Sequence, residues 1–397
     1  MAVAVLCAAA VLAGVLQPAV GTAADGGAHS CVSSARASGG GPARRVLDIT
    51  RRTRRELGLE AALVRVTVDG REVVTGAFGE SMTGVPAKPN MHFRPGSVAI
   101  AYLGTVLLQL VDEQRVRLDD PVSRWLPGLP HADRITLRML GSSTSGLADY
   151  VTDPDFLAAI AADPFRQWTG PELVGISTDE PLWYDPGANW NYSHANFVIL
   201  GAALERITGT RLDRLLEQRV MRPLGLRDTR NGYTPDIPPP VLHAFTSERG
   251  TYEESTFWNP SWTTAPGAVI TTHICDLARS AEAIGTGELL SRHSHRVQLN
   301  PGTVGLGGPT ATCPATVCQA NTEAVHYGLG LIIQNGWIVQ NPSFFGYAAV
   351  QAYLPDRRLA IAVATTPGRE TPDGNTAMTI TQRIAAAIAH GHPLASG

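Results

Sequence analysis

Residues 93–97, FRPGS, lead directly into the apolar run VAIAYLGTVLLQLVDE at residues 98–113. Apolar side chains recur in this run at helical spacing, and the Pro-Gly pair before it is typical of a turn that ends where a helix begins. The pattern predicts a buried helix that ends near Glu113. Ser97 therefore caps or opens this helix.

On the N-terminal side of this helix, the sequence predicts one helix and two strands. Residues 44–57 have an apolar face at helical spacing and a solvated basic face. Residues 63–68 and 72–78 are rich in β-branched side chains, and Asp69-Gly70 between them is a strong hairpin signal. Two antiparallel strands are expected to follow the first helix.

On the C-terminal side, residues 118–266 favour short helices and Pro/Gly turns, most clearly at 200–207 and 211–220. Strand patterns return late, at residues 327–334, 347–353 and 359–365. Residues 376–389 then predict a C-terminal helix. This order predicts an α+β fold of the α/β-sandwich type, in which an antiparallel sheet is flanked by N- and C-terminal helices and carries an inserted helical lobe.

The predicted domain spans residues 43–395. Its sheet lobe comprises about 43–96 and 267–395, and its helical lobe about 97–266. With 44% hydrophobic and 17% charged residues, the 397-residue chain can bury a sizeable core. Its 32 basic and 35 acidic side chains give a net charge of -3. Nucleic-acid binding is therefore not expected.

Residues 1–24 begin with the apolar run MAVAVLCAAAVLAGVLQPAV and end with small residues, which is typical of an export signal. A Gly/Ser-rich stretch over residues 25–42 predicts a flexible tail. No Lys or Arg precedes the apolar run, so an uncleaved anchor stays open as an alternative. The protein is expected to be secreted or held at the cell envelope, with membrane contact only if this segment is retained.

Four cysteines remain after the predicted signal, at positions 31, 275, 313 and 318. An even number in an exported chain favours disulfides, and four cysteines allow three pairings. We prefer Cys313 with Cys318, which closes a short loop, and Cys31 with Cys275. A metal site at the close pair is the lesser interpretation, because no histidine stands at ligand spacing from it.

Further short motifs follow FRPGS in a fixed order. Together with it, they resemble the family of class C beta-lactamases, D,D-carboxypeptidases and esterases over roughly residues 44–390. The matching segments are LDDPV at 118–122, WLP at 125–127, residues 135–140, TSGL at 144–147, Tyr184 with Pro186-Gly187, NYS at 191–193, RPLGL at 222–226, Gly346-Tyr347 and YLP at 353–355. The resemblance implies the beta-lactamase/transpeptidase-like fold and a serine nucleophile at Ser97.

In that family, a lysine one helical turn after the serine activates it, in the motif S-x-x-K. Here the turn is Ser97-Val98-Ala99-Ile100. Isoleucine can neither accept a proton nor supply positive charge. General-base assistance is commonly worth roughly 100- to 10,000-fold in rate, so ordinary beta-lactamase activity is not expected.

The second family motif, Y-x-N, supplies a tyrosine beside the serine and an asparagine that holds the substrate amide. This chain has Tyr192-Ser193-His194, so a histidine replaces the asparagine. Histidine has an ordinary pKa of about 6.5 and could serve as base in place of the lysine, in an arrangement of Ser97, Tyr192 and His194. Alternatively, His194 only fills space and forms local hydrogen bonds.

The third motif, K-T-G or H-T-G, lies on the strand beside the active site, where its basic residue meets a substrate carboxylate. Counting back from Gly346 places Gln340, Asn341 and Pro342 at these positions, so Gln340 and Asn341 become the candidate substrate-binding residues. Proline removes a backbone donor there. The backbone N–H groups of Ser97 and Ser343 could still form an oxyanion hole.

No cofactor or metal is expected, and the pair His293 and His295 is assigned to a polar loop. Two hypotheses remain. In the first, the chain is a serine hydrolase or acyltransferase with altered machinery, weak or absent beta-lactamase and D,D-peptidase activity, and possible esterase activity through Ser97. In the second, it is a non-catalytic member whose cleft binds a cell-wall peptide, lipid or protein partner. The expected ligand is a small molecule or a cell-wall-derived acyl or peptide group.

Overall fold

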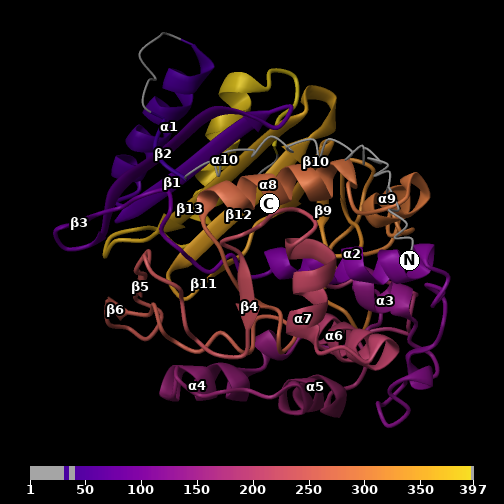
Figure 1. The fold of residues 1–397 in the computed structure, drawn as a ribbon. Helices are drawn as coiled ribbons and strands as arrows, with labels where there is room; N and C mark the ends of the chain where they lie inside the picture. Colours follow the sequence, from indigo (N-terminus) through magenta and orange to yellow (C-terminus); the bar gives the residue numbers. More distant parts are fainter. Residues whose placement is uncertain (1–30, 35–40, 395–397) are drawn as a thin grey trace, which may run out of the picture. The chain divides into compact units, whose positions relative to one another are not determined.

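In the computed structural model of this chain, residues 31–34 and 41–394 are described (Figure 1). The predicted signal at 1–24 lies outside these residues, as do positions 25–30 and 35–40 of the predicted tail. No helix within the described ranges is both long and apolar enough to cross a membrane.

Helices and strands follow one another along the described chain as follows. The α-helices are α1 (Pro42–Glu56), α2 (Val98–Asp112), α3 (Leu137–Ser142), α4 (Pro154–Ala162), α5 (Gly170–Asp179), α6 (His194–Thr208), α7 (Leu212–Leu216), α8 (Ile274–Thr286), α9 (Arg292–Leu299) and α10 (Thr376–Ile388). The strands are β1 (Ala61–Val68), β2 (Arg71–Met82), β3 (Val85–Pro86), β4 (Arg230–Gly232), β5 (Phe245–Thr246), β6 (Glu253–Glu254), β7 (Val269–Thr271), β8 (Val325–Tyr327), β9 (Ile332–Gln334), β10 (Trp337–Gln340), β11 (Ser343–Phe344), β12 (Tyr347–Leu354) and β13 (Leu359–Thr366).

One antiparallel sheet joins the two ends of the chain. Its strand order is β3-β2-β1-β13-β12-β10-β9-β8, and β11 pairs with β12. The central pairing of β1 with β13 runs from Ala61 opposite Thr366 to Val68 opposite Leu359. The predicted α+β fold, with an antiparallel sheet and an inserted helical region, is thus confirmed.

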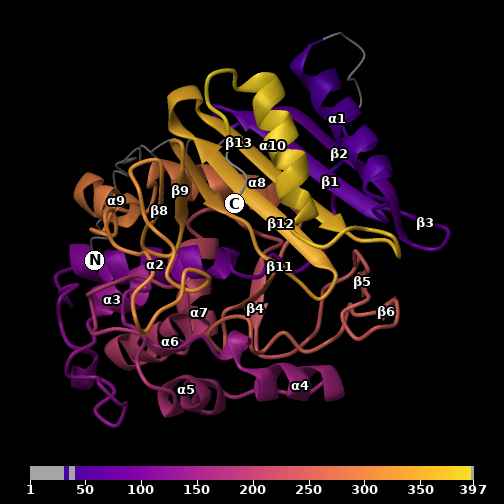
Figure 2. The same cartoon turned by 180° about the vertical axis from the view of Figure 1, so that it is seen from behind.

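The central strands are buried on both faces, so they are nearly continuously apolar. Val64 and Val363, paired across β1 and β13, belong to the core that includes side chains of α1 and α10. The next pair, Leu63 and Ala364, belongs to the core shared with α2, α6 and α8. Figures 1 and 2 show the consequence: α8 covers one face of the sheet, and α1 and α10 cover the other. Helices α2 to α7 lie beyond the edge of the sheet in both views.

The predicted strand over residues 327–334 is in fact two strands, β8 and β9. The segment Gly328–Leu331 between them turns outward because its backbone bonds to helical neighbours. The Leu329 N–H donates to the Gln298 carbonyl at 2.8 Å, and the Gly330 N–H donates to the Gly141 carbonyl at 3.0 Å. Gly330 has a φ of 75°, which favours glycine. The mixed apolar pattern did not reveal this turn.

Two helices were also missed or shortened by the sequence patterns. His293 and His295 lie in α9, so their assignment to a polar loop is wrong. The predicted helix at 211–220 is the short α7, which continues as a π-helical turn, Glu217–Met221. The π-turn widens the backbone spacing without breaking the helical run, and such a change leaves no clear mark on apolar periodicity.

Both preferred disulfides are confirmed. Cys31 pairs with Cys275, and Cys313 pairs with Cys318. The first attaches the segment before α1 to α8, since Cys275 is near the start of that helix. The second joins two cysteines five positions apart, in the long connection between α9 and β8.

Candidate active site

Ser97 is the cap residue of the buried helix α2, as the sequence predicts. Nearly every side chain of α2 is buried, so the helix is held rigidly within the molecule. Gly96 has a φ of 49°, which turns the chain sharply into the helix. Ser97 itself is half-buried and lines a cavity of about 390 Å³.

Tyr192 is placed by a network beneath the loop that precedes α6. The Ser143 hydroxyl donates to the Asn191 carbonyl at 2.8 Å and accepts from the Ser193 N–H at 3.1 Å. The buried Asn196 amide donates to the same hydroxyl at 3.0 Å. Because each member is buried and bonded, the loop keeps Tyr192 at a fixed position facing the nucleophile helix.

The Tyr192 hydroxyl donates to Ser97 Oγ over 3.5 Å, a long hydrogen bond. Burial raises the pKa of the Tyr192 phenol well above its ordinary value, and the Asp149 carboxylate raises it further. The phenol is therefore protonated at neutral pH and cannot accept the Ser97 proton. Tyr192 alone does not activate the serine.

Ile100 occupies the position where the resemblance places a lysine, and it is completely buried. Its carbonyl and its Cγ2 methyl group lie against Gly330, at 2.4 and 3.2 Å from the point where a Cβ on that glycine would stand. The Gln340 side-chain amide donates to the Gly330 carbonyl. An apolar contact and an amide thus fill the space beneath Ser97.

His194 begins α6 and is paired with Asp149, a partner that the sequence patterns did not reveal. His194 Nδ1 lies 3.1 and 3.0 Å from the two carboxylate oxygens, and the His194 backbone N–H also donates to Asp149. Both side chains are largely buried. An Nδ1–H donor to a carboxylate leaves Nε2 as an acceptor, which is the orientation that a catalytic base needs.

The His194 ring stands edge-on to the Tyr192 ring, with 5.0 Å between centroids. Within the described part of the chain, however, no hydrogen bond joins His194 to Ser97 or to the Tyr192 hydroxyl. A proton could pass between Ser97 and His194 only through a bridging group such as water. Asp149 precedes His194 by 45 positions, and no local sequence pattern marks it as a partner of the histidine.

The segment around the third motif, residues 340–344, packs against the turn before Ser97. A Cβ on Gly96 would stand 2.7 Å from the Phe344 ring and 2.9 Å from the Pro342 ring, so both side chains pack directly on this glycine. The Phe344 ring also lies edge-on to Trp262, at 6.1 Å. This edge of the site is therefore apolar and crowded where the resemblance expects an open strand.

The predicted site residues lie mostly together. Ser97, Tyr192, His194, Gln340 and Asn341 all line the cavity at Ser97. Ser343 is exposed at the start of β11 and is not among the lining residues, so the oxyanion hole remains a prediction. Sequence reasoning missed the other walls of the cavity, formed by Trp190, residues 319–321 and β8 with Tyr327.

Residues 319–321 follow the disulfide Cys313–Cys318 directly. The disulfide loop is attached to the helical region by the Thr312 hydroxyl, which donates to the Trp183 carbonyl at 2.7 Å, and by the Asn189 amide, which donates to Gly308 at 3.1 Å. Both sulfurs are buried. The disulfide thus fixes one wall of the cavity.

Replacing both Cys313 and Cys318 by serine is expected to lower the free energy of unfolding by about 2 kcal/mol, because the closed loop is short. Denaturant melts of the double variant would measure this. A fall of less than about 0.5 kcal/mol would mean that the loop is held by its hydrogen bonds alone. The wall at 319–321 would then not depend on the disulfide.

Among the described residues, the one group with metal-ligand character is Asp228, His273 and Asp276. None of the three lines the cavity at Ser97. The His273 Nδ1 already accepts the Asp276 N–H at 3.1 Å, and its Nε2 faces Asp228 at 3.3 Å. These contacts use both ring nitrogens of His273. The group is therefore explained as the N-terminal cap of α8, His273, with Asp228 as its ion-pair partner.

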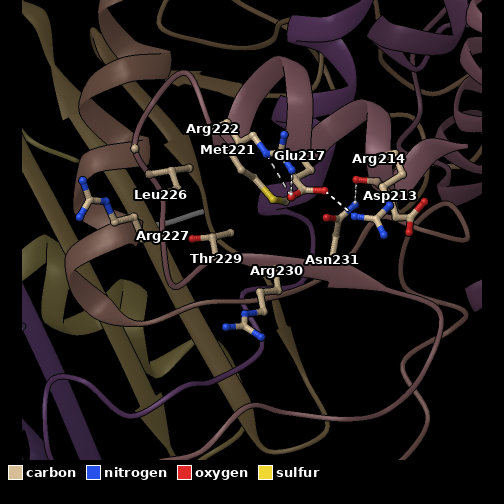
Figure 3. A pocket seen from close by; sticks show the side chains of 11 residues that line it. Asp213, Arg214, Glu217, Met221, Arg222, Leu226, Arg227, Thr229, Arg230 and Asn231 are labelled. Carbon is tan, nitrogen blue, oxygen red and sulfur yellow. Dashed lines mark hydrogen bonds and ion pairs between the residues drawn. The ribbon is translucent and has the colours of Figure 1, made fainter. Parts of the chain in front are cut away.

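A second cavity, of about 700 Å³, lies between the end of α7 and β4 (Figure 3). Glu217 there accepts from both Arg214 and Arg222, whereas Arg227 and Arg230 point away from this pair. Its charged lining includes this bonded set together with Arg227 and Arg230, and it contains neither Ser97 nor a histidine. The cavity at Ser97 is therefore the candidate active site.

Comparison with known proteins gives a family match over most of the chain. The family model described as Beta-lactamase matches residues 47–385. Penicillin-binding protein 4* of Bacillus subtilis is 22% identical over 72% of this chain and 63% of its own length. Esterase EstB of Burkholderia gladioli is 33% identical over 46% of this chain and 49% of its own. The matched regions thus cover about half to just under two thirds of these relatives.

Solved structures match over a larger share. A D-stereospecific amidohydrolase from Streptomyces sp. has a TM-score of 0.72 at 26% identity and covers 88% of this chain and 98% of its own. A D-amino acid amidase from Ochrobactrum anthropi, solved with D-phenylalanine, has a TM-score of 0.73 at 20% identity, with 88% and 99% covered. The second likeness concerns the fold alone.

Proposed function

The chain belongs to the Beta-lactamase family, and from this premise we propose that its cavity binds a small acyl- or peptide-type ligand while Ser97 has lost the activation that rapid acyl transfer needs. Beta-lactamase and D,D-peptidase activities are then weak or absent. The burial of Ile100 against Gly330 carries the proposal, because it leaves no cation or base beneath the serine.

Among the described residues, no lysine or arginine lines the cavity to supply the missing group. Lys88 is the only lysine in the sequence, and it is exposed and does not line the cavity. Arg94, three residues before Ser97, is buried elsewhere and donates to the Pro235 carbonyl. Burial lowers the pKa of Arg94 to about 10, so it still carries its charge at neutral pH and cannot act as a base.

The Asp149–His194 pair favours a second, slower function. A carboxylate that holds an imidazole by Nδ1 is the arrangement that orients a general base, and His194 lines the same cavity as Ser97. With one bridging water, His194 could accept the Ser97 proton as the serine oxygen attacks the carbonyl carbon of an activated ester, and then return the proton to the departing alcohol or phenol. We propose that any residual activity of this protein is a slow esterase reaction of this kind.

Intact-mass spectrometry with a penicillin and a fluorophosphonate tests the proposal. We expect no penicilloyl adduct, and slow fluorophosphonate labelling that Ser97→Ala abolishes. His194→Gln should slow the labelling by roughly 100-fold if the histidine is the base, and leave it unchanged otherwise. Rapid penicilloyl-enzyme formation or steady beta-lactam turnover that depends on Ser97 would refute the proposed loss of activation.

We also propose that the protein is exported. The two disulfides support this, since structural disulfides persist in oxidising compartments, as does the similarity to penicillin-binding proteins. Expression in a secreting host with mass analysis of the product would show whether residues 1–24 are removed. Retention of the whole product in the cytoplasm would contradict export.

A further inference from the structure

None of the described residues that line the cavity at Ser97 is a lysine, arginine, aspartate or glutamate. From this we infer that it selects a small uncharged ligand bearing an aromatic or apolar group, and rejects the same ligand when it carries a carboxylate. The inference rests on the proposed function, because it assumes that this cavity binds the ligand. The inference extends that proposal by naming the chemical class of ligand that the cavity binds.

The two histidines of the lining are already engaged by the protein. His194 faces the Asp149 carboxylate, which would cancel its charge if it were protonated. His326 lies between two backbone carbonyls, with Nδ1 3.1 Å from Thr322 and Nε2 3.2 Å from Leu299. Both ring nitrogens of His326 are thus directed at the protein. A ligand carboxylate would therefore find no free ring N–H on His326, and at His194 it would share the ring with the Asp149 carboxylate.

Aromatic side chains form the opposite wall. The Trp190 and Tyr327 rings lie 5.6 Å apart, and the Tyr192 and Tyr327 rings lie 5.9 Å apart. The Trp190 N–H is already used, because it donates to the Ser142 carbonyl at 3.0 Å. These rings therefore offer their apolar surfaces to a ligand, and contact with such surfaces favours aromatic groups.

Two buried polar atoms in the same wall also lack hydrogen bonds. The Gln334 Oε1 atom and the Tyr327 hydroxyl have no partner that meets hydrogen-bond geometry. The Gln340 side chain lies near the Tyr327 hydroxyl, but the Gln340 amide donates to the Gly330 carbonyl instead. Burying an acceptor without a donor is unfavourable. A ligand amide N–H that reached Gln334 Oε1 would relieve that cost, whereas a carboxylate has no N–H to offer; the Tyr327 hydroxyl could bond to either group.

The volume of the cavity and the absence of charged side chains in its described lining both suit a small uncharged ligand. A cavity of about 390 Å³ is within the usual range for small ligands, and desolvating a carboxylate without a partner is far more costly than desolvating an amide. The arginine-lined cavity of Figure 3 shows the contrast, since charged groups dominate it. We expect discrimination of at least about tenfold in favour of the neutral form at Ser97.

The test compares N-acetyl-phenylalaninamide with N-acetyl-phenylalanine by isothermal titration calorimetry at neutral pH. These two probes differ only in whether the C-terminal group is neutral or charged. We expect the amide to bind Ser97→Ala at least about tenfold more tightly than the acid. Equal or tighter binding of the acid, or binding of neither probe, would overturn the inference.

A matched pair of variants locates the effect. Ala320 and Ala315 are both exposed on the segment around the Cys313–Cys318 disulfide, but only Ala320 lines the cavity. Ala320→Lys should reduce the preference for the amide by about threefold or more, and Ala315→Lys should leave it unchanged. If both variants changed the preference equally, the probes would be binding outside the cavity and the inference would fail.

These outcomes are separate from those of the proposed function. Loss of serine activation is measured as product release or covalent adduct with Ser97 present. Selectivity is measured as a ratio of affinities in Ser97→Ala, which cannot turn over either probe. Fast Ser97-dependent turnover together with a strong preference for the amide would refute the proposed loss of serine activation and leave the inferred ligand selectivity intact.

Discussion

The variant Ile100→Lys is expected to raise the rate of Ser97 acylation by a chromogenic ester by about 100- to 10,000-fold. A lysine at this position would extend from α2 toward the Ser97 hydroxyl in place of the isoleucine. Because residue 100 is completely buried, desolvation would lower the pKa of the new amine, so that a useful fraction is neutral and can accept the serine proton at neutral pH.

The control variant is Ile100→Met, which is unbranched like lysine but has no amine. If reshaping the space at Gly330 were enough to activate Ser97, the methionine variant would be activated as well. We expect only the lysine variant to gain, and the gain to vanish in the double variant with Ser97→Ala. Thermal unfolding of each variant confirms that the compared proteins are folded.

A folded Ile100→Lys protein with no gain would contradict the proposed cause of inactivity. In that case, the crowding of Pro342 and Phe344 over Gly96 would become the first obstacle to substrate. Replacing Phe344 by alanine in the lysine background would separate the two effects. A gain that appears only in that combination would mean that closure of the strand edge limits the reaction more than the missing base.

The sequence predicts the framework well because local patterns determine it. The Pro-Gly turn and apolar spacing place Ser97 at the start of α2, and the Asp69-Gly70 signal correctly places the turn between β1 and β2. Motif spacing also brings Tyr192, His194 and Gln340 into one cavity with Ser97. The helix start and the hairpin depend on residues close together in the chain, whereas the grouping of the distant site residues rests on the family resemblance.

Contacts between distant segments could not be predicted in the same way. Nothing near Asp149 indicates that it meets His194, since the pair forms only after α3 and α6 pack and the intervening loop folds. The packing of Phe344 on Gly96 likewise depends on β11 reaching α2. The break at Gly328–Leu331 was missed because its cause is hydrogen bonding to α9 and α3 rather than local preference.

That break is also where the fold and the site depend on each other most directly, and Gly330→Ala should therefore be strongly destabilising. A Cβ on Gly330 would stand 2.4 Å from the Ile100 carbonyl oxygen, closer than real contacts allow, and the residue has a φ of 75°. The strained backbone costs about 1–2 kcal/mol, and forced displacement of α2 typically adds about 1–3 kcal/mol.

Gly336→Ala is the matched control for this prediction. Gly336 has a φ of 82°, nearly the same backbone conformation, but nothing lies within 4 Å of an added Cβ. It should lose only the backbone cost, about 1–2 kcal/mol. The difference between the two unfolding free energies, measured in denaturant, isolates the contact between residue 330 and Ile100.

A difference of less than about 0.5 kcal/mol would show that α2 can shift away from Gly330 at little cost. The close contact between Ile100 and Gly330 would then not hold the nucleophile helix in place, and Ser97 could move relative to Tyr192. A large difference would instead mean that the contact of residue 330 with the backbone and Cγ2 of Ile100 holds the nucleophile helix in place. In that case the Ile100→Lys variant must keep enough of this contact to fold, and its gain in rate would be accompanied by a measurable fall in stability.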